Sequence, residues 1–191
     1  MKNVFTAAAV VAMAGLPMWA MAQTPPPTSP QPTPQAQHDA AKTQVGDAGF
    51  VKKMLEGGMA EVELGKLAVQ KGASESVKQF GQRMVDDHSK AGDELKKIAE
   101  EKKITPPAAI SAKDKAEQER LSKLSGEAFD RAYMRTMVAD HRKDVSEVRA
   151  EATTGKDPEV KAWASKTLPT LEEHLKLAED TNKAVGTSGK K

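Results

Sequence analysis

The sequence predicts an all-helical protein in which four long helices form a bundle and a long crossover joins the second helix to the third. Four observations carry this prediction. No segment alternates apolar and polar residues as a half-buried strand does, and apolar residues recur at helical spacing from Asp47 onward. Glycine or proline separates the helical segments, and two of these segments share a residue pattern.

The first 22 residues have the order of a secretory signal peptide. Lys2 precedes an apolar run, and the small-residue motif that follows ends at Ala22. The apolar run is too short to span a bilayer comfortably. We therefore predict cleavage after Ala22, no transmembrane segment in the mature chain, and a periplasmic or secreted protein.

Residues 23–46 are predicted to be a disordered leader. Their first part consists of proline, threonine, serine, glutamine and alanine without a charge, which buries too little apolar surface to fold. The leader is either a tether that holds the domain away from a wall or membrane, or a solvated segment without a role. A helical domain is expected over residues 47–185, followed by a polar tail over 186–191.

Local signals bracket four long helices and one short helix. We expect them at residues 47–71, 74–103, 111–125, 127–154 and 158–185. Gly72 and Gly155 are typical helix stops, and Asp157 is an N-cap before Pro158 at the first helical position. The first two long helices, and the last two, are joined by about two residues, which makes each pair antiparallel.

The second and third long helices share a pattern at a fixed offset of 53 residues. The pattern F/Y-x-x-x-M-V-x-D-H-x-K-x-x-x-E begins at Phe80 and again at Tyr133. We attribute it to two helix hairpins related by pseudo-two-fold symmetry, which is how ferritin-like bundles are built. Because the crossover, with its short extra helix, is long, the second and third long helices should run parallel.

Three histidines lie on the apolar stripes of these helices at similar heights. His88, His141 and His174 each follow their helix start by about 14 to 16 residues, or roughly 21 to 24 Å along the axis. Glu61 has a comparable height on the first helix. These positions predict a mid-bundle metal site with the three histidines and Glu61 as ligands, for zinc, iron, manganese or copper.

Asp87, Asp140 and Tyr133 are the candidates for residues that support these ligands. A residue adjacent to a helical histidine points about 100° away from it, so Asp87 and Asp140 do not face the histidine that follows them in the chain. The alternative to a metal site is a buried polar cluster in which the histidines hydrogen-bond Glu61 and fix the helix register.

Composition excludes several classes of protein. The 191 residues include no cysteine, which excludes disulfides, thiolate metal sites and a cysteine nucleophile. With 29 basic and 27 acidic residues, the chain lacks the basic excess of a nucleic-acid binder. A di-iron centre is not expected, because Val85, Val138 and Leu171 replace the glutamates of Glu-x-x-His pairs. No serine has the context of a hydrolase nucleophile, so a nucleophilic hydrolase is not expected, and an enzyme is the least favoured class of function.

Four segments carry a resemblance to a known family. They are AEVELGKLA (60–68), FGQRMVDDHSKAGDEL (80–95), FDRAYMRTMVADHRK (129–143) and TLPTLEEHL (167–175). From Phe50 to Leu177 the chain resembles a family of uncharacterised exported bacterial proteins, a domain of unknown function with a ferritin-like bundle. Its members are often labelled predicted outer membrane protein, which for a helical, charge-rich domain implies a peripheral association.

Three functions follow from these patterns. The first is an exported periplasmic bundle that binds a metal ion in a stress-related role. The second is a structural or interaction module of the cell envelope with an envelope partner, a purely structural polar core and no metal. A redox enzyme that uses the same centre is the third.

Overall fold

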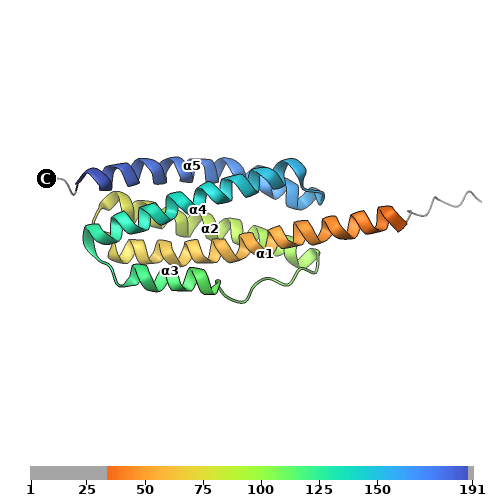
Figure 1. The fold of residues 1–191 in the computed structure, drawn as a ribbon, viewed down its shortest axis with the longest axis horizontal. Helices are drawn as coiled ribbons and strands as arrows, with labels where there is room; N and C mark the ends of the chain where they lie inside the picture. The colour runs from red at the N-terminus through yellow and green to blue at the C-terminus, as the bar shows by residue number, and fades with distance from the viewer. Residues whose placement is uncertain (1–33, 189–191) are drawn as a thin grey trace, which may run out of the picture. The chain divides into compact units, whose positions relative to one another are not determined.

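The computed structural model describes residues 34–188. The predicted signal peptide, residues 23–33 of the predicted leader and the last three residues lie outside the described part of the chain. Within residues 34–188 the structure has five α-helices and no strand (Figure 1). They are α1 (Pro34–Lys71), α2 (Glu75–Glu101), α3 (Ala112–Ser122), α4 (Gly126–Thr154) and α5 (Pro158–Ser188). The prediction of an all-helical protein is confirmed.

Two helix boundaries differ from the sequence prediction. The apolar pattern places the start of the first helix near Asp47, whereas α1 begins at Pro34. Proline is favourable at the first helical position, and the following residues are rich in alanine and glutamine, which have high helix propensity. These preferences explain a helix where no apolar stripe predicts one. At the other end, α5 continues three residues beyond the predicted limit, to Ser188.

The four long helices form two hairpins. Residues 72–74 join α1 to α2, and residues 155–157 join α4 to α5, so each pair is antiparallel. Helix α1 also packs against α4, and α2 against α5. The crossover between α2 and α4 carries α3, which packs against α1 and α4. As Figure 1 shows, the crossover returns the chain so that α2 and α4 run in the same direction.

Two buried aspartates link the hairpins reciprocally. The carboxylate of Asp130 on α4 accepts two backbone N–H groups of the α1–α2 turn at 3.0 and 2.7 Å. The carboxylate of Asp47 on α1 accepts two backbone N–H groups of the α4–α5 turn at 3.2 and 2.6 Å. The two aspartates, and the two turns, are each 83 positions apart in the chain. The hairpins are therefore related by a pseudo-two-fold that exchanges α1 with α4 and α2 with α5.

The 53-residue repeat is not explained by this hairpin symmetry, and our attribution of it was wrong. The repeat relates α2 to α4, two helices that the hairpin symmetry does not exchange. Instead, its matched residues face each other: the ring centroids of Phe80 and Tyr133 lie 6.1 Å apart, and those of His88 and His141 lie 5.7 Å apart. Because α2 and α4 run parallel and in register, each layer of the interior selects similar residues from both helices.

The interior consists of two apolar clusters with a polar layer between them. On α2, Met84 belongs to one cluster and Leu95 to the other, and the buried His88 lies between them. The other three helices repeat this order around their own buried polar residues. These are Glu61 on α1, His141 on α4 and His174 on α5.

Helices α1 and α2 approach closely at two glycines. A β-carbon on Gly65 would lie 2.6 Å from the carbonyl oxygen of Gly81, and one on Gly81 would lie 2.8 Å from the carbonyl oxygen of Gly65. Only glycine fits at such distances without a shift of the backbone. Gly65 lies one helical turn after Glu61, so this approach brings the Glu61 carboxylate close to α2.

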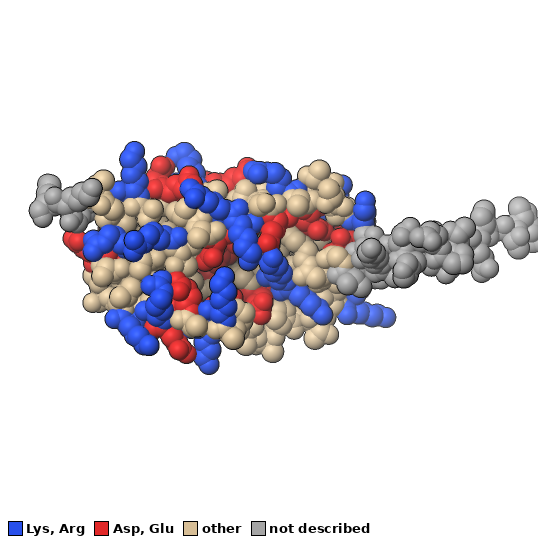
Figure 2. All heavy atoms as spheres, viewed as in Figure 1, with Lys and Arg blue, Asp and Glu red and all other residues tan. Residues whose placement is uncertain are grey.

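The surface of the described helices is rich in charge. On the face shown in Figure 2, basic and acidic side chains are intermixed. None of the helices in residues 34–188 combines the length and the apolarity that crossing a membrane requires.

Candidate functional site

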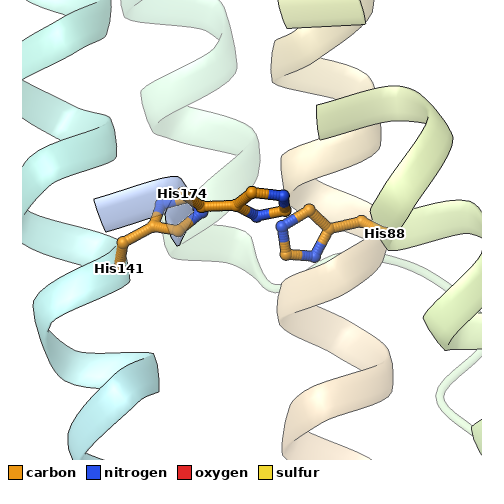
Figure 3. A group of neighbouring side chains, drawn as sticks. All are labelled: His88, His141 and His174. Atoms are coloured by element: carbon orange, nitrogen blue, oxygen red, sulfur yellow. The ribbon is translucent and has the colours of Figure 1, made fainter. Parts of the chain in front are cut away.

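The structure brings the three predicted histidines together at the centre of the domain. Figure 3 shows the rings of His88 from α2, His141 from α4 and His174 from α5 turned toward one another. Their ring centroids lie 5.3 to 5.7 Å apart, and one ring nitrogen of each lies within 4.8 Å of the others. Nitrogen ligands of a tetrahedral zinc ion lie about 3.3–3.5 Å apart, so a modest inward movement of the rings would complete such a site.

Each imidazole has one nitrogen fixed by an acceptor that cannot donate. Nδ1 of His88 lies 3.0 Å from the Glu61 carboxylate, and Nδ1 of His141 lies 2.9 Å from the carbonyl oxygen of Met137. Nε2 of His174 lies 2.8 Å from the Asp87 carboxylate. Because carboxylates and carbonyls only accept, each of these nitrogens carries the hydrogen and donates it.

In the neutral form of each ring, the second nitrogen therefore carries a lone pair. These atoms are Nε2 of His88, Nε2 of His141 and Nδ1 of His174. All three are buried and have no hydrogen-bond partner among the described residues. Imidazoles held in this way by a carboxylate or carbonyl are the usual form of metal-ligating histidine.

Glu61 lies beside two of the histidines rather than among the converging nitrogens. Its Oε2 accepts from His88, and its Oε1 lies 3.4 Å from Nδ1 of His141 without a hydrogen bond, because that N–H points to the Met137 carbonyl. Burial alone would raise the pKa of Glu61, but His88 and His141 outweigh it and lower the pKa to about 2. Glu61 is thus an anion that orients His88 and has one oxygen free.

The environment keeps two of the three imidazoles neutral. Burial lowers the pKa of His174 to about 4 and also lowers the pKa of His141. Burial alone would lower the pKa of His88 as well, but the Glu61 carboxylate outweighs it and raises that pKa. Since a metal binds the neutral form, a cation would compete with one proton at His88.

The predicted supporting residues have different positions. Asp87 supports the site, but it holds His174 on α5 and not the adjacent His88, as the 100° step along a helix predicts. Asp140 is half-buried and hydrogen-bonds none of the rings; burial and Glu61 raise its pKa to about 6. The hydroxyl of Tyr133 has no partner among the described residues, and its ring stacks on Phe129.

Sequence reasoning missed Asp144 and the backbone of Met137. Asp144 lies near the cluster, and burial together with Glu61 raises the pKa of its carboxyl to about 8. Its position three residues after His141 was the available signal, since positions i and i+3 share a helix face. Nothing in a sequence pattern identifies the Met137 carbonyl, because the rotamer of His141 decides which backbone group it meets.

Comparison with known proteins places the chain in a family. Residues 31–181 match the family model described as "Domain of unknown function (DUF4142)". The chain belongs to this family. The match confirms the resemblance that the four sequence segments carry. No curated protein and no solved structure matches the chain significantly.

An inner pocket and a cleft adjoin Glu61 in this DUF4142 domain. An inner pocket of about 40 Å³ is lined by His88, His174 and mainly apolar side chains, and it has room for a few water-sized groups. A larger cleft of about 550 Å³ lies between α1, α3 and α4, with Asp140 among its lining residues. Glu61 and Asp144 line both cavities.

Proposed function

We propose that the protein is an exported metal-binding protein in which His88, His141 and His174 hold one divalent transition-metal ion. We further propose that the two hairpins and the long crossover form a ferritin-like four-helix bundle, and that the protein acts in the periplasm in a stress-related role. Export rests on the signal-peptide pattern of the first 22 residues, and the binding function rests on the geometry of the cluster.

The observation that carries the proposal is the set of three buried, converging ring nitrogens without a hydrogen-bond partner among the described residues. Each unsatisfied buried polar atom costs about 1–3 kcal/mol, so three of them cost roughly 3–9 kcal/mol against a typical total stability of 5–15 kcal/mol. No protein group in the described residues meets these nitrogens. A single cation between the rings would satisfy all three at once, because the nitrogens already converge.

The donor set fits a mononuclear site with four ligands. Three imidazoles supply nitrogen, and the unpartnered Oε1 of Glu61 or a solvent molecule can supply the fourth ligand. The negative charge of Glu61 also offsets half the charge of a divalent ion in a buried site. Nitrogen-rich sites of this type suit zinc and copper, and also iron and manganese with added oxygen ligands.

Metal analysis together with thermal unfolding tests the proposal. Protein prepared without a histidine tag and loaded with Zn²⁺ should retain about one ion per chain. Removal of the metal with a chelator should destabilise the fold, by about 2.7 kcal/mol when zinc had been present at 100 times its dissociation constant. That energy corresponds to a melting-point decrease of roughly 5–11 °C for a domain of this size.

Two histidine variants make this test specific. His141→Leu should lose both the ion and the effect of chelator, whereas His38→Ala, which removes the one histidine outside the cluster, should keep both. Metal-free wild type whose melting point is unaffected by zinc or chelator would instead favour a purely structural polar core in a cell-envelope module. In that case His141→Leu should be tolerated or stabilising, because buried polar groups are costly unless fully paired.

A further inference from the structure

We propose that divalent cations reach the histidine cluster through the cleft between α1, α3 and α4, and that Asp140 and Asp144 guide them. This inference rests on the proposed function, since it concerns the route to that site. It assigns a role to two carboxyl groups that hydrogen-bond none of the histidines.

The cleft adjoins the inner pocket beside the cluster, with shared residues at the junction. The two cavities share the lining residues Met54, Gly57, Glu61 and Asp144. Gly57 leaves the junction wide, because a β-carbon there would meet no atom within 4 Å. Beyond the junction, His88 and His174 line the inner pocket. A cation that crosses the junction therefore arrives directly at two of the proposed ligands.

The charges of the cleft favour a cation. Six acidic and four basic side chains line it. Asp140 and Asp144 form no ion pair within the part of the chain that the structure describes, so both carboxyl groups are available to a cation. At the inner end, the buried Glu61 has one unpartnered oxygen. Among the described residues, the route thus begins and ends at carboxyl groups that no salt bridge engages.

A second opening also reaches His88 but is less suited to a cation. It is a groove of about 410 Å³ beside α1 and α2, and it shares Gly58 with the inner pocket. Its two acidic residues, Glu63 and Asp93, are each paired with the lysine three positions later, at 2.8 and 3.1 Å. A cation would therefore meet neutralised pairs in the groove and unpaired carboxyl groups in the cleft.

Adjacent glycines allow the two routes to be blocked separately. We would measure the rates of Co²⁺ binding and release by stopped-flow absorbance at pH 8.5, above the pKa of about 8 of Asp144, with Co²⁺ at micromolar concentration. Gly57→Leu narrows the junction to the cleft and should slow both rates by about the same factor, on the order of tenfold, with the dissociation constant unchanged. Gly58→Leu, which faces the groove, and Gly49→Leu, which faces open space on α1, should leave both rates close to wild type.

The carboxylates give a second test that does not narrow the route. Asp140→Asn combined with Asp144→Asn should lower the association rate about tenfold at low salt, and the difference should shrink at high salt, because charge-lined clefts act by steering. The control is Asp86→Asn combined with Asp180→Asn, which removes two exposed charges away from the cleft and should have little effect.

The outcomes separate this inference from the proposed function. If the wild type binds no Co²⁺, the function fails and the route fails with it. If it binds Co²⁺ and Gly58→Leu slows binding while Gly57→Leu does not, the cation enters through the groove and the cleft route is wrong. If the variant with both Asp140→Asn and Asp144→Asn binds Co²⁺ at the wild-type rate at low and at high salt, these two residues do not guide the cation.

Discussion

The close approach of α1 and α2 predicts opposite effects for the same substitution at two glycines of α2. In Gly81→Ala the new β-carbon would lie 2.8 Å from the β-carbon of Ala68 and 2.8 Å from the carbonyl oxygen of Gly65. Neither atom belongs to a flexible side chain, so the helices must separate. In Gly92→Ala the new β-carbon would meet nothing within 4 Å.

The magnitude follows from two effects. Both substitutions gain about 1 kcal/mol in helix propensity, whereas overpacking costs about 1–3 kcal/mol at Gly81 alone. Gly92→Ala should therefore raise the free energy of unfolding by up to about 1 kcal/mol. The free energy of unfolding of Gly81→Ala should be about 1–3 kcal/mol lower than that of Gly92→Ala, because both variants gain the same helix propensity and only Gly81→Ala is overpacked.

Urea denaturation of the metal-free proteins measures both effects. In thermal unfolding the difference corresponds to roughly 2–12 °C for a domain of this size. Separation of the helices should also lengthen the 3.0 Å contact between Glu61 and His88, which an altered His88 titration by NMR would report. Equal stabilisation by Gly81→Ala and Gly92→Ala would refute the close approach and with it the register that places Glu61 beside His88.

Three further predictions concern single buried side chains in the metal-free protein. Asp130→Ala should lower the free energy of unfolding, measured by urea denaturation, by about 2–4 kcal/mol, because two backbone N–H groups lose a charged acceptor. A decrease below about 1 kcal/mol would argue against the link between the hairpins. Tyr133→Phe should raise stability by about 1 kcal/mol, since its hydroxyl has no protein partner in the described residues, and a marked loss would show that the hydroxyl is satisfied. Burial lowers the pKa of His174 from 6.5 to about 4. The neutral ring therefore contributes fully to the free energy of unfolding above pH 6.5, and this contribution decreases as the pH falls toward 4. Wild type should therefore lose about 3 kcal/mol more than His174→Leu between pH 7 and pH 4, and parallel pH profiles would contradict that shift.

Much of the site could be predicted from the sequence because it lies on regular helices. Helical spacing places His88, His141 and His174 on buried stripes, and a rise of 1.5 Å per residue gives them a common height. Short connections fix the antiparallel pairs, and the long crossover makes α2 and α4 parallel. The cluster therefore follows from the helical spacing of the histidines, the lengths of the helices and their connections, and the tendency of apolar stripes to face one another.

The remaining features depend on contacts between helices, which a single sequence does not contain. The partner of Asp87 is His174 on another helix, and only the packing of α2 against α5 reveals it. The 53-residue repeat suggested a hairpin duplication, whereas the 83-residue relation between Asp47 and Asp130 marks the actual symmetry of the hairpins. That relation rests on two aspartates and two turns, too few matches to stand out before their hydrogen bonds are known.

Binding of one ion by three imidazoles, through the nitrogens that the protein leaves unpartnered, can be observed directly. X-ray absorption spectroscopy of the zinc-loaded protein tests it most directly, because the outer-shell scattering of imidazole rings reveals how many histidines bind. The geometry of the cluster predicts three histidine nitrogens at about 2.0–2.1 Å from zinc and one further oxygen or nitrogen ligand. Zinc surrounded by oxygen ligands with one histidine or none would contradict it.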